Sequence, residues 1–274
     1  MKKIVWILIF YINLFAGERI VTLSPSLNEI VFALGSGKDI VANTLHSDYP
    51  KESESIPKVG GYASISLEKI LLSKPTLVFA QNYDEELLLN LKKLSLNYYS
   101  FKTNNLDSIK TTIKKIAKIL HKENKASKII KEIDSSLEAL KNIVKDKTFM
   151  IVISPKLDLD RTIYISGNNL YFNDIIKYSG NSNAYKSKSD AQPVVNMEKI
   201  INMNPDVVVL LAPFMHKQKL TKEQLKANWY KLPITASKNK DIYVIDKDYA
   251  GIPSNRVVNF INDFKKILED VKNK

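Results

Sequence analysis

One short unit occurs twice in this 274-residue chain, and it constrains the fold more than any other feature. Residues 67–80 read LEKILLSKPTLVFA, and residues 197–212 read MEKIINMNPDVVVLLA. In each copy a polar residue, Ser66 or Asn196, precedes an apolar helical pattern and can cap its first turn. A proline then ends the helix, and the apolar run that follows is typical of a buried strand. The repeat predicts two lobes of similar design.

The segment before the first copy predicts a parallel sheet covered by helices. Residues 20–23 and 40–42 are apolar, β-prone runs, and between them lies a helical pattern that stops at Gly35. Ser26 and Glu29 form a capping-box pattern, so we expect a helix to begin there. Strand–helix–strand order is typical of α/β folds.

A long amphipathic segment separates the two copies. Residues 121–147 place apolar side chains at three- and four-residue spacing without Gly or Pro, which predicts one helix of about 20 residues and about 30 Å. A single apolar stripe suits a rigid connector lying across a surface. We therefore expect a leader at 1–16, an N-terminal lobe at 17–121, a connecting helix at 122–147 and a C-terminal lobe at 148–274.

The first residues resemble an export signal. Met1-Lys-Lys is followed by a short apolar run and then by the small residue Ala16. The run is short for a membrane span, so we expect cleavage after Ala16 and an exported, soluble protein. An uncleaved anchor or a first buried strand remains the alternative.

Composition narrows the possible chemistry. The chain has no Cys, which excludes disulfides, thiolate metal sites, a catalytic thiol and a lipid-modified cysteine. The net charge of +12 comes mainly from lysines scattered along amphipathic segments such as 109–120, without an Arg cluster or a nucleic-acid-binding motif. We expect a solvated basic surface and no nucleic-acid partner.

Motifs and composition also bear on three other classes of protein: an enzyme, a binder of free metal ions and a structural adhesin. The sequence lacks phosphate-loop, zinc-protease and esterase motifs, so we expect no enzyme. A binder of free zinc or manganese needs several converging His and carboxylate ligands, and His occurs only at positions 46, 121 and 216. A structural adhesin is the third alternative.

Four stretches carry a family resemblance: RIVTLSPSLNEIVFALG, SDYP, PKVGGYASISLEKILLSKPTLVFA and MEKIINMNPDVVVL. Together they resemble the periplasmic binding proteins that serve ABC importers of vitamin B12, ferric siderophores and haem, most closely the vitamin B12-binding and generic iron-chelate members. The resemblance covers nearly all of the mature chain. It implies an α/β fold of two Rossmann-like lobes with central parallel sheets, joined by one long connecting helix. It also implies a monomer with no intrinsic cofactor and a ligand held between the lobes.

The resemblance gives the repeated unit a function. In this family a carboxylate on each lobe pairs with arginines of the membrane permease, and the matching positions are Glu68 and Glu198. The expected partner is therefore a permease dimer, with only peripheral contact with the inner-membrane complex. The alternative is that both glutamates merely stabilise the helix dipole.

Loops that follow core strands supply the expected ligand-binding residues. Tyr49 and Tyr62 match positions where vitamin B12-binding relatives place aromatic contacts, whereas Gln81 and Gln192 stand where those relatives carry Trp. Gly61 stands where haem-binding members place an iron-ligating Tyr. The remaining candidates are His46, Asp48, Tyr83, Arg161, Tyr164, Phe214, His216, Asp248 and Tyr249.

The glutamines at positions 81 and 192, where vitamin B12-binding relatives carry Trp, favour an iron chelate, such as a ferric siderophore, slightly over a corrinoid. The resemblance to siderophore-binding relatives allows His216 and Tyr249 to complete the coordination of ferric iron, since phenolate is a hard donor that suits Fe(III). Haem and nickel-chelate complexes are the alternatives within the family.

Overall fold

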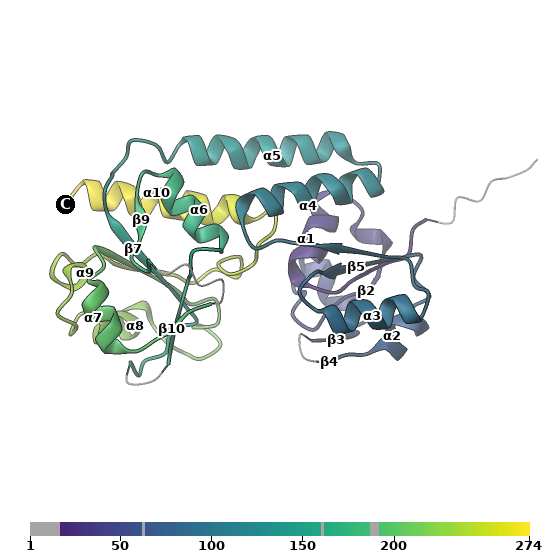
Figure 1. Ribbon diagram of the computed structural model, residues 1–274, viewed down its shortest axis with the longest axis horizontal. Coiled ribbons are helices and arrows are strands. Elements are labelled where there is room, and N and C mark those ends of the chain that lie inside the picture. The colour runs from purple at the N-terminus through teal and green to yellow at the C-terminus, as the bar shows by residue number, and fades with distance from the viewer. Residues whose placement is uncertain (1–16, 62–63, 160–161, 187–191) are drawn as a thin grey trace, which may run out of the picture.

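The computed structural model describes residues 17–61, 64–159, 162–186 and 192–274, which form two α/β lobes (Figure 1). The predicted leader at 1–16 lies outside these residues, as do Tyr62 and Arg161. Helices α4, α5 and α10 lie along one side of the molecule, shown at the top of Figure 1. Within the described ranges, no helix is long and apolar enough to cross a membrane.

The N-terminal lobe is built on a four-stranded parallel sheet in the order β2–β1–β5–β6. Its strands are β1 (Ile20–Thr22), β2 (Ile40–Ala42), β5 (Leu77–Gln81) and β6 (Tyr98–Phe101). A small hairpin pairs β3 (Gly60–Gly61) with β4 (Ser64–Ile65). Its helices are α1 (Pro25–Ala33), α2 (Leu67–Leu72), α3 (Glu85–Lys93) and α4 (Leu106–Ile119).

The C-terminal lobe has a mixed sheet in the order β10–β8–β7–β11–β12, with β9 also paired to β7. Its strands are β7 (Thr148–Ile153), β8 (Ile163–Ile165), β9 (Ser182–Asn183), β10 (Val194–Val195), β11 (Val207–Leu211) and β12 (Ile242–Ile245). Strands β7, β9, β11 and β12 are parallel, as predicted, whereas β8 and β10 add an antiparallel edge. Its helices are α6 (Tyr171–Tyr178), α7 (Met197–Met203), α8 (Lys222–Trp229), α9 (Thr235–Lys238) and α10 (Val257–Lys272).

The repeated unit forms the predicted helix and strand in both lobes. The Ser66 hydroxyl accepts from the amide of Lys69 at 3.2 Å and caps α2. Asn196 Oδ1 accepts from the amide of Lys199 at 2.9 Å and caps α7. The strands that follow, β5 and β11, are entirely buried and lie inside their sheets, each with a parallel neighbour on both sides. The two-lobe interpretation of the repeat is confirmed.

The start of α1 corrects one sequence prediction. The N-cap is Ser24, whose hydroxyl accepts from the amide of Leu27, and Pro25 is the first helical residue. Proline favours this first position because its fixed φ suits the helix and it has no amide to satisfy. The Ser26–Glu29 capping box is therefore wrong, and Glu29 is available for a different contact. The helix ends before Gly35 as predicted, with a φ of +81° at that glycine.

The connecting helix is shorter than predicted. Helix α5 spans Glu123–Glu138, 16 residues, and packs against α4 and α10. Beyond it the chain turns, with Asn142 and Asp146 in the left-handed region. The predicted lobe boundaries at 121 and 147 stay a prediction.

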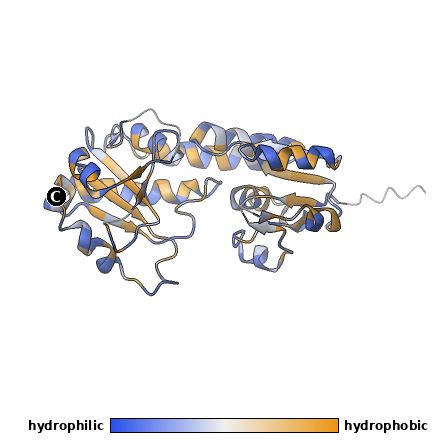
Figure 2. Cartoon of the chain, turned by 60° about the horizontal axis from the view of Figure 1, so that its bottom comes forward, coloured by the Kyte–Doolittle hydropathy of each residue, from blue (hydrophilic) through white to orange (hydrophobic). Residues whose placement is uncertain are grey.

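One hydrophobic cluster runs through both lobes. It joins Ile20 of β1, Ile113 of α4 and Ile133 of α5 to Phe149 of β7 and Phe264 of α10. Figure 2 shows the strands of both sheets as hydrophobic and the helices as mixed. Because packed cores resist deformation, we expect this shared cluster to restrain motion between the lobes.

Candidate functional site at the junction of the lobes

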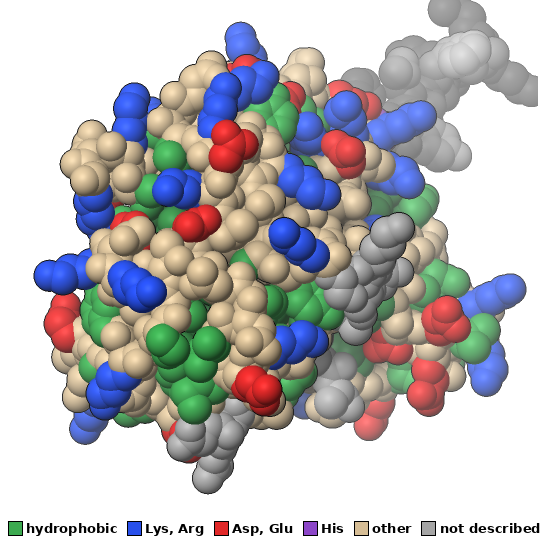
Figure 3. Space-filling view, turned by 60° about the vertical axis from the view of Figure 1, so that its left-hand side comes forward, with side chains coloured by type: hydrophobic (Ala, Val, Ile, Leu, Met, Phe, Trp, Pro, Cys, Tyr) green, Lys and Arg blue, Asp and Glu red, His purple; other side chains and the backbone are tan. Residues whose placement is uncertain are grey.

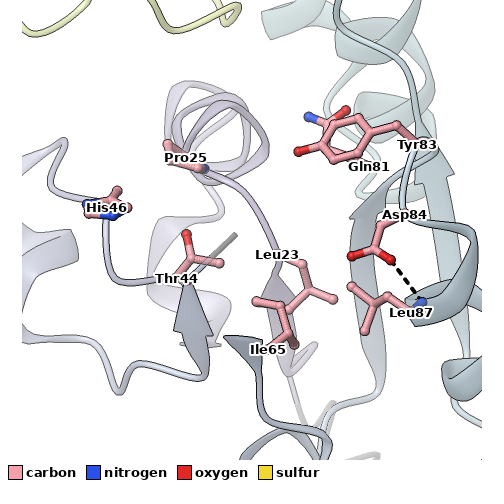
Figure 4. A pocket seen from close by; sticks show the side chains of 10 residues that line it. Leu23, Pro25, Thr44, His46, Ile65, Gln81, Tyr83, Asp84 and Leu87 are labelled. Atoms are coloured by element: carbon pink, nitrogen blue, oxygen red, sulfur yellow. Dashed lines mark hydrogen bonds between the residues drawn. The ribbon is translucent and has the colours of Figure 1, made fainter. Parts of the chain in front are cut away.

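A pocket opens at the carboxyl edge of the N-terminal sheet, where parallel α/β sheets usually bind ligands. The loops after β1, β2 and β5 and the hairpin line it, through Leu23, Pro25, Thr44, His46, Gly61, Ile65, Gln81, Tyr83, Asp84 and Leu87. Figure 4 shows His46 and Tyr83 on opposite sides of this pocket. The structure thus brings together two of the predicted ligand residues.

Gln81 has a structural role that the sequence did not reveal. Its side chain is buried, and Nε2 lies 3.1 Å from the hydroxyl of Ser24, 2.9 Å from that of Ser26 and 3.1 Å from that of Thr103. An amide nitrogen has two N–H donors, so it serves two of these three hydroxyls at a time. The amide fixes the loops after β1 and β6 against the end of β5.

The loop after β2 presents Tyr49 at the surface. Asn28 of α1 donates to the Tyr49 carbonyl at 2.9 Å and to the hydroxyl of Ser53 at 2.7 Å. The backbone of this loop is therefore held by a buried amide, while the Tyr49 side chain stays 43% exposed. An aromatic ring presented from a fixed loop suits the face of a flat ligand.

Asp48, next to Tyr49, is exposed and lies near a partly buried cation. Lys58 Nζ donates to Asn43 Oδ1 at 2.8 Å and to the carbonyl of Ser53 at 2.9 Å. Burial lowers the pKa of Lys58, and the negative charge of Asp48 works against that shift. Asp48 therefore adds negative charge to the rim of the loop.

A buried ion pair joins the lobes beside this loop. Arg256, which directly precedes α10, donates through Nε to Glu29 Oε2 at 3.1 Å and through Nη2 to Glu29 Oε1. The Ser254 hydroxyl also donates to Glu29 Oε2. Both charged side chains are almost fully buried, at 6% and 2% exposure. Glu29 belongs to α1 of the N-terminal lobe, so this contact spans the junction.

The same guanidinium faces three predicted ligand residues: it contacts Asp248 and Tyr49, and the centroid of the Tyr249 ring lies 5.9 Å from the guanidinium carbon. Arg256 Nη1 donates to Asp248 Oδ2 at 2.7 Å, and the guanidinium carbon lies 3.7 Å from the centroid of the Tyr49 ring. Burial opposes the charge of Arg256, but the carboxylates of Glu29 and Asp248 raise its pKa, so it stays charged. Sequence reasoning missed Arg256 and Glu29. The available signal was that the chain has only three arginines.

His216 and Tyr249 bind separate carboxylates. His216 Nε2 lies 3.0 Å from Asp246 Oδ2, and Lys222 donates to the other oxygen of Asp246 at 3.1 Å. The Tyr249 hydroxyl donates to Asp263 of α10 at 2.5 Å. Burial, reinforced by Asp263, raises the pKa of Tyr249. Coordination of ferric iron by the Tyr249 phenolate would require this hydrogen bond to break.

The C-terminal lobe has its own hollow at the carboxyl edge of its sheet. The loops after β7 and β11 line it, through residues 154–158 and 212–215 together with Gln218, Leu220 and Leu225. Phe214 is 52% exposed there, and Lys217 lies 5.7 Å above its ring. Phe214 thus provides an aromatic face on the second lobe.

The remaining predicted ligand residues lie at the antiparallel edge of the second sheet. Gln192 is exposed just before β10. Tyr164 of β8 is 41% exposed and pairs across the strands with Val194. In the described part of the chain, the residues that bond to or face the Arg256 guanidinium are Glu29, Asp248, Tyr49 and Tyr249, and neither Gln192 nor Tyr164 is among them.

Glu68 and Glu198 are exposed in the first turns of α2 and α7. Figure 1 places both helices on the side of the molecule opposite α5. Glu68 also borders an apolar groove between α2 and α3, which is lined by Leu67, Leu71, Leu72, Lys74, Asn90, Lys93 and Leu94. Leu72 in this groove is 72% exposed.

On the face of the molecule that Figure 3 shows, the charged side chains are dispersed. Figure 3 shows Lys and Arg side chains spread over one end of the molecule, with carboxylates between them. A nucleic-acid-binding face would gather cations into a patch or stripe. In the described part of the chain, no three His, Asp or Glu side chains converge as a metal site.

The chain is similar to proteins of known family and structure. A family model described as "Periplasmic binding protein" matches residues 20–249. The vitamin B12-binding protein of Vibrio parahaemolyticus is 27% identical over 263 residues, which cover 94% of this chain and 91% of that protein. The vitamin B12-binding protein BtuF of Vibrio cholerae superposes with a TM-score of 0.78 at 20% identity, covering 94% of this chain and 98% of that one. The haem-binding protein HutB of Vibrio cholerae superposes with a TM-score of 0.76 at 22% identity, covering 92% and 98%.

Proposed function

The chain belongs to the periplasmic binding protein family, and we propose that it captures an iron chelate or a corrinoid between its lobes and delivers it to an ABC importer. The iron chelate would be a ferric siderophore or a similar complex. Binding and release are the whole chemistry in this proposal, which assigns no reaction and no resident cofactor to the chain.

The observation that carries the proposal is the pairing of Tyr49 and Asp248 on one buried arginine. They come from different lobes, and their side chains are exposed by 43% and 64%. Tyr49 offers a flat apolar face, and the Asp248 carboxylate accepts hydrogen bonds. A large planar or polycyclic ligand with donor groups on its rim would use both features, and His46 and Tyr83 add polar groups from the neighbouring pocket.

Haem is the second candidate. His46 and Tyr83 line one pocket, and imidazole and phenolate are both axial ligands of haem iron. The structural similarity to HutB fits this choice. The presence of Gly61 where haem-binding relatives carry a ligating Tyr favours the first candidate.

Delivery would use the side of the molecule opposite α5. We propose that Glu68 and Glu198 bind basic residues of the two halves of a permease dimer, and that the apolar groove beside Glu68 adds contact area. The protein would act as a monomer in the periplasm after removal of residues 1–16, and would touch the membrane complex only through this face.

A titration of the mature protein tests the ligand class. Cyanocobalamin, haemin, ferric enterobactin, nickel–histidine, Zn²⁺ and Mn²⁺ would each be added and followed by calorimetry. We expect saturable, sub-micromolar binding of one chelate, and weaker binding in Tyr49→Ala and Asp248→Ala. Tyr178→Ala is the matched control, since Tyr178 is similarly exposed at 38% but contacts Lys141 near the end of α5. The proposal would be overturned if a bare metal ion bound tightly, or if none of the probes bound.

A further inference from the structure

We propose that Arg256 is a positioning residue that fixes Tyr49 and Asp248, one from each lobe, as the two sides of a single ligand-binding surface. This inference rests on the proposed function. Glu29 and Ser254 hold Arg256 in place, and none of these three residues was expected to contribute to binding. The ligand class that fits is a flat conjugated ring system with hydrogen-bond donors at its edge.

The inner half of the guanidinium is anchored. Nε and Nη2 both bind Glu29, which gives a two-point contact that sets the plane of the group. Ser254 donates to the same carboxylate and also accepts from the amide of Arg256 at 3.1 Å. The plane of the arginine is therefore fixed from α1 and from its own loop.

The outer half of the guanidinium faces residues at the surface, and the partly buried Tyr249 ring lies farther off, with its centroid 5.9 Å from the guanidinium carbon. Nη1 binds Asp248, which is 64% exposed, and one face stacks on Tyr49, which is 43% exposed. Neither contact is needed to compensate the charge of Arg256, because Glu29 already does so inside the junction. The planar group instead aligns a ring and a carboxylate at the surface, and a lysine lacks this geometry.

Adjacent residues of α1 support both parts of this arrangement. Asn28 binds the carbonyl of Tyr49 at 2.9 Å, and Glu29 holds the arginine on which the Tyr49 ring lies. The backbone and the ring of Tyr49 are thus fixed from one turn of one helix. Motion of α1 relative to Arg256 would move the ring, so the surface is set by the way the lobes meet.

Arg256→Lys tests the inference. Lysine keeps a positive charge near Glu29 but loses the stacked plane and the bond to Asp248. The probe is whichever of cyanocobalamin, haemin and ferric enterobactin binds the unaltered protein most tightly. We expect affinity to fall about tenfold or more, with an unchanged circular dichroism spectrum. Arg19→Lys is the control, since Arg19 donates to the carbonyls of Lys74 and Ser73 at the amino edge of the N-terminal sheet, away from Arg256.

Coupling between the variants separates positioning from a general structural effect. Asp248→Ala and Tyr49→Ala should each weaken binding much less in the Arg256→Lys protein than in the unaltered one, since the residues they remove are already misplaced. Fully additive losses, or unchanged affinity in Arg256→Lys, would overturn the inference.

A ligand-free measurement keeps the two proposals apart. With 3-fluorotyrosine labelling, the Tyr49 signal is assigned by its loss in Tyr49→Phe. In Arg256→Lys we expect this signal to shift and narrow toward that of a solvated tyrosine, while it stays in place in Arg19→Lys. If no probe binds the unaltered protein, the proposed ligand class fails, and the fluorine signal still decides the role of Arg256. An unmoved signal would refute that role.

Discussion

Glu29 and Arg256 form a buried ion pair although 227 positions separate them in the chain. One lies in the first helix of the N-terminal lobe and the other at the start of the last helix. Burial raises the pKa of the Glu29 carboxyl, and hydrogen bonds from Arg256 and Ser254 oppose that shift. The pair lies where the two lobes meet, so its removal should lower the free energy of unfolding of the whole protein.

We predict that Glu29→Ala lowers the free energy of unfolding by about 3–5 kcal/mol, because it leaves the guanidinium buried without its main partner. The double variant Glu29→Met/Arg256→Met should be more stable than Glu29→Ala, since no buried charge remains. Urea unfolding followed by circular dichroism measures both. A double variant less stable than Glu29→Ala would show that the ion pair itself, and not the unpaired charge, dominates.

Gln81→Leu should lower the free energy of unfolding by about 1–3 kcal/mol, because buried hydroxyls of Ser24, Ser26 and Thr103 lose their amide donor. Gln192→Leu is the matched control, since Gln192 is exposed, and its effect should stay within about 0.5 kcal/mol. Thermal unfolding of the two variants provides the comparison. Equal effects would contradict the anchoring role of Gln81.

Local signals predicted much of the fold. Ser66 and Asn196 cap their helices, and the strands after Pro75 and Pro205 lie inside their sheets, as the repeat indicated. These features depend on neighbours within a few residues, so sequence alone contains them. The correct start of α1 could also have been predicted from a local signal, because Ser24 followed by Pro25 is a typical helix start.

The residues that organise the candidate site could not be predicted from such local signals. The local pattern places Glu29 in a capping box, and nothing near it in the sequence indicates its actual partner, Arg256, which lies in the other lobe. The family resemblance places Gln81 where relatives carry an aromatic ligand contact, whereas its hydrogen bonds reach Ser24 and Thr103 from different loops. Contacts of this kind arise from the meeting of distant segments, which a single sequence does not encode in any short pattern.

The stability contributed by Asp246 should depend on pH in a defined direction. Burial disfavours its charge, but hydrogen bonds from His216 and Lys222 outweigh this and lower its pKa. A lowered carboxyl pKa stabilises the fold above the unfolded value of about 3.9, and this stabilisation is lost as the pH falls through the folded value. The contribution is therefore present at neutral pH and absent in strong acid.

Asp246→Asn tests this in a His216→Gln background, where Lys222 remains as the cation. We expect Asp246→Asn to cost about 1 kcal/mol at neutral pH, and the cost to shrink as the pH falls below about 4. Urea unfolding across a pH series gives the difference between the two proteins. A difference that grew on acidification would have the opposite sign to the predicted linkage.

The proposed docking role of Glu68 and Glu198 can be tested by reversing their charges. Glu68→Lys/Glu198→Lys should abolish ligand uptake through the importer while leaving chelate affinity unchanged, because both residues lie in exposed first turns on the side opposite α5. Each single reversal should reduce uptake less than the pair. Transport into vesicles that carry the importer and calorimetric titration measure the two quantities separately.

Glu86→Lys is the control for the helix dipole. Glu86 is also exposed in the first turn of a helix, α3. Its reversal should therefore lower the free energy of unfolding by about 0.3–1 kcal/mol, which is the loss expected from the interaction with the helix dipole alone. If docking is the role of the pair, Glu86→Lys keeps full uptake at equal stability. If all three reversals reduce uptake in proportion to lost stability, the repeated glutamates only stabilise their helices, and the docking face must lie elsewhere.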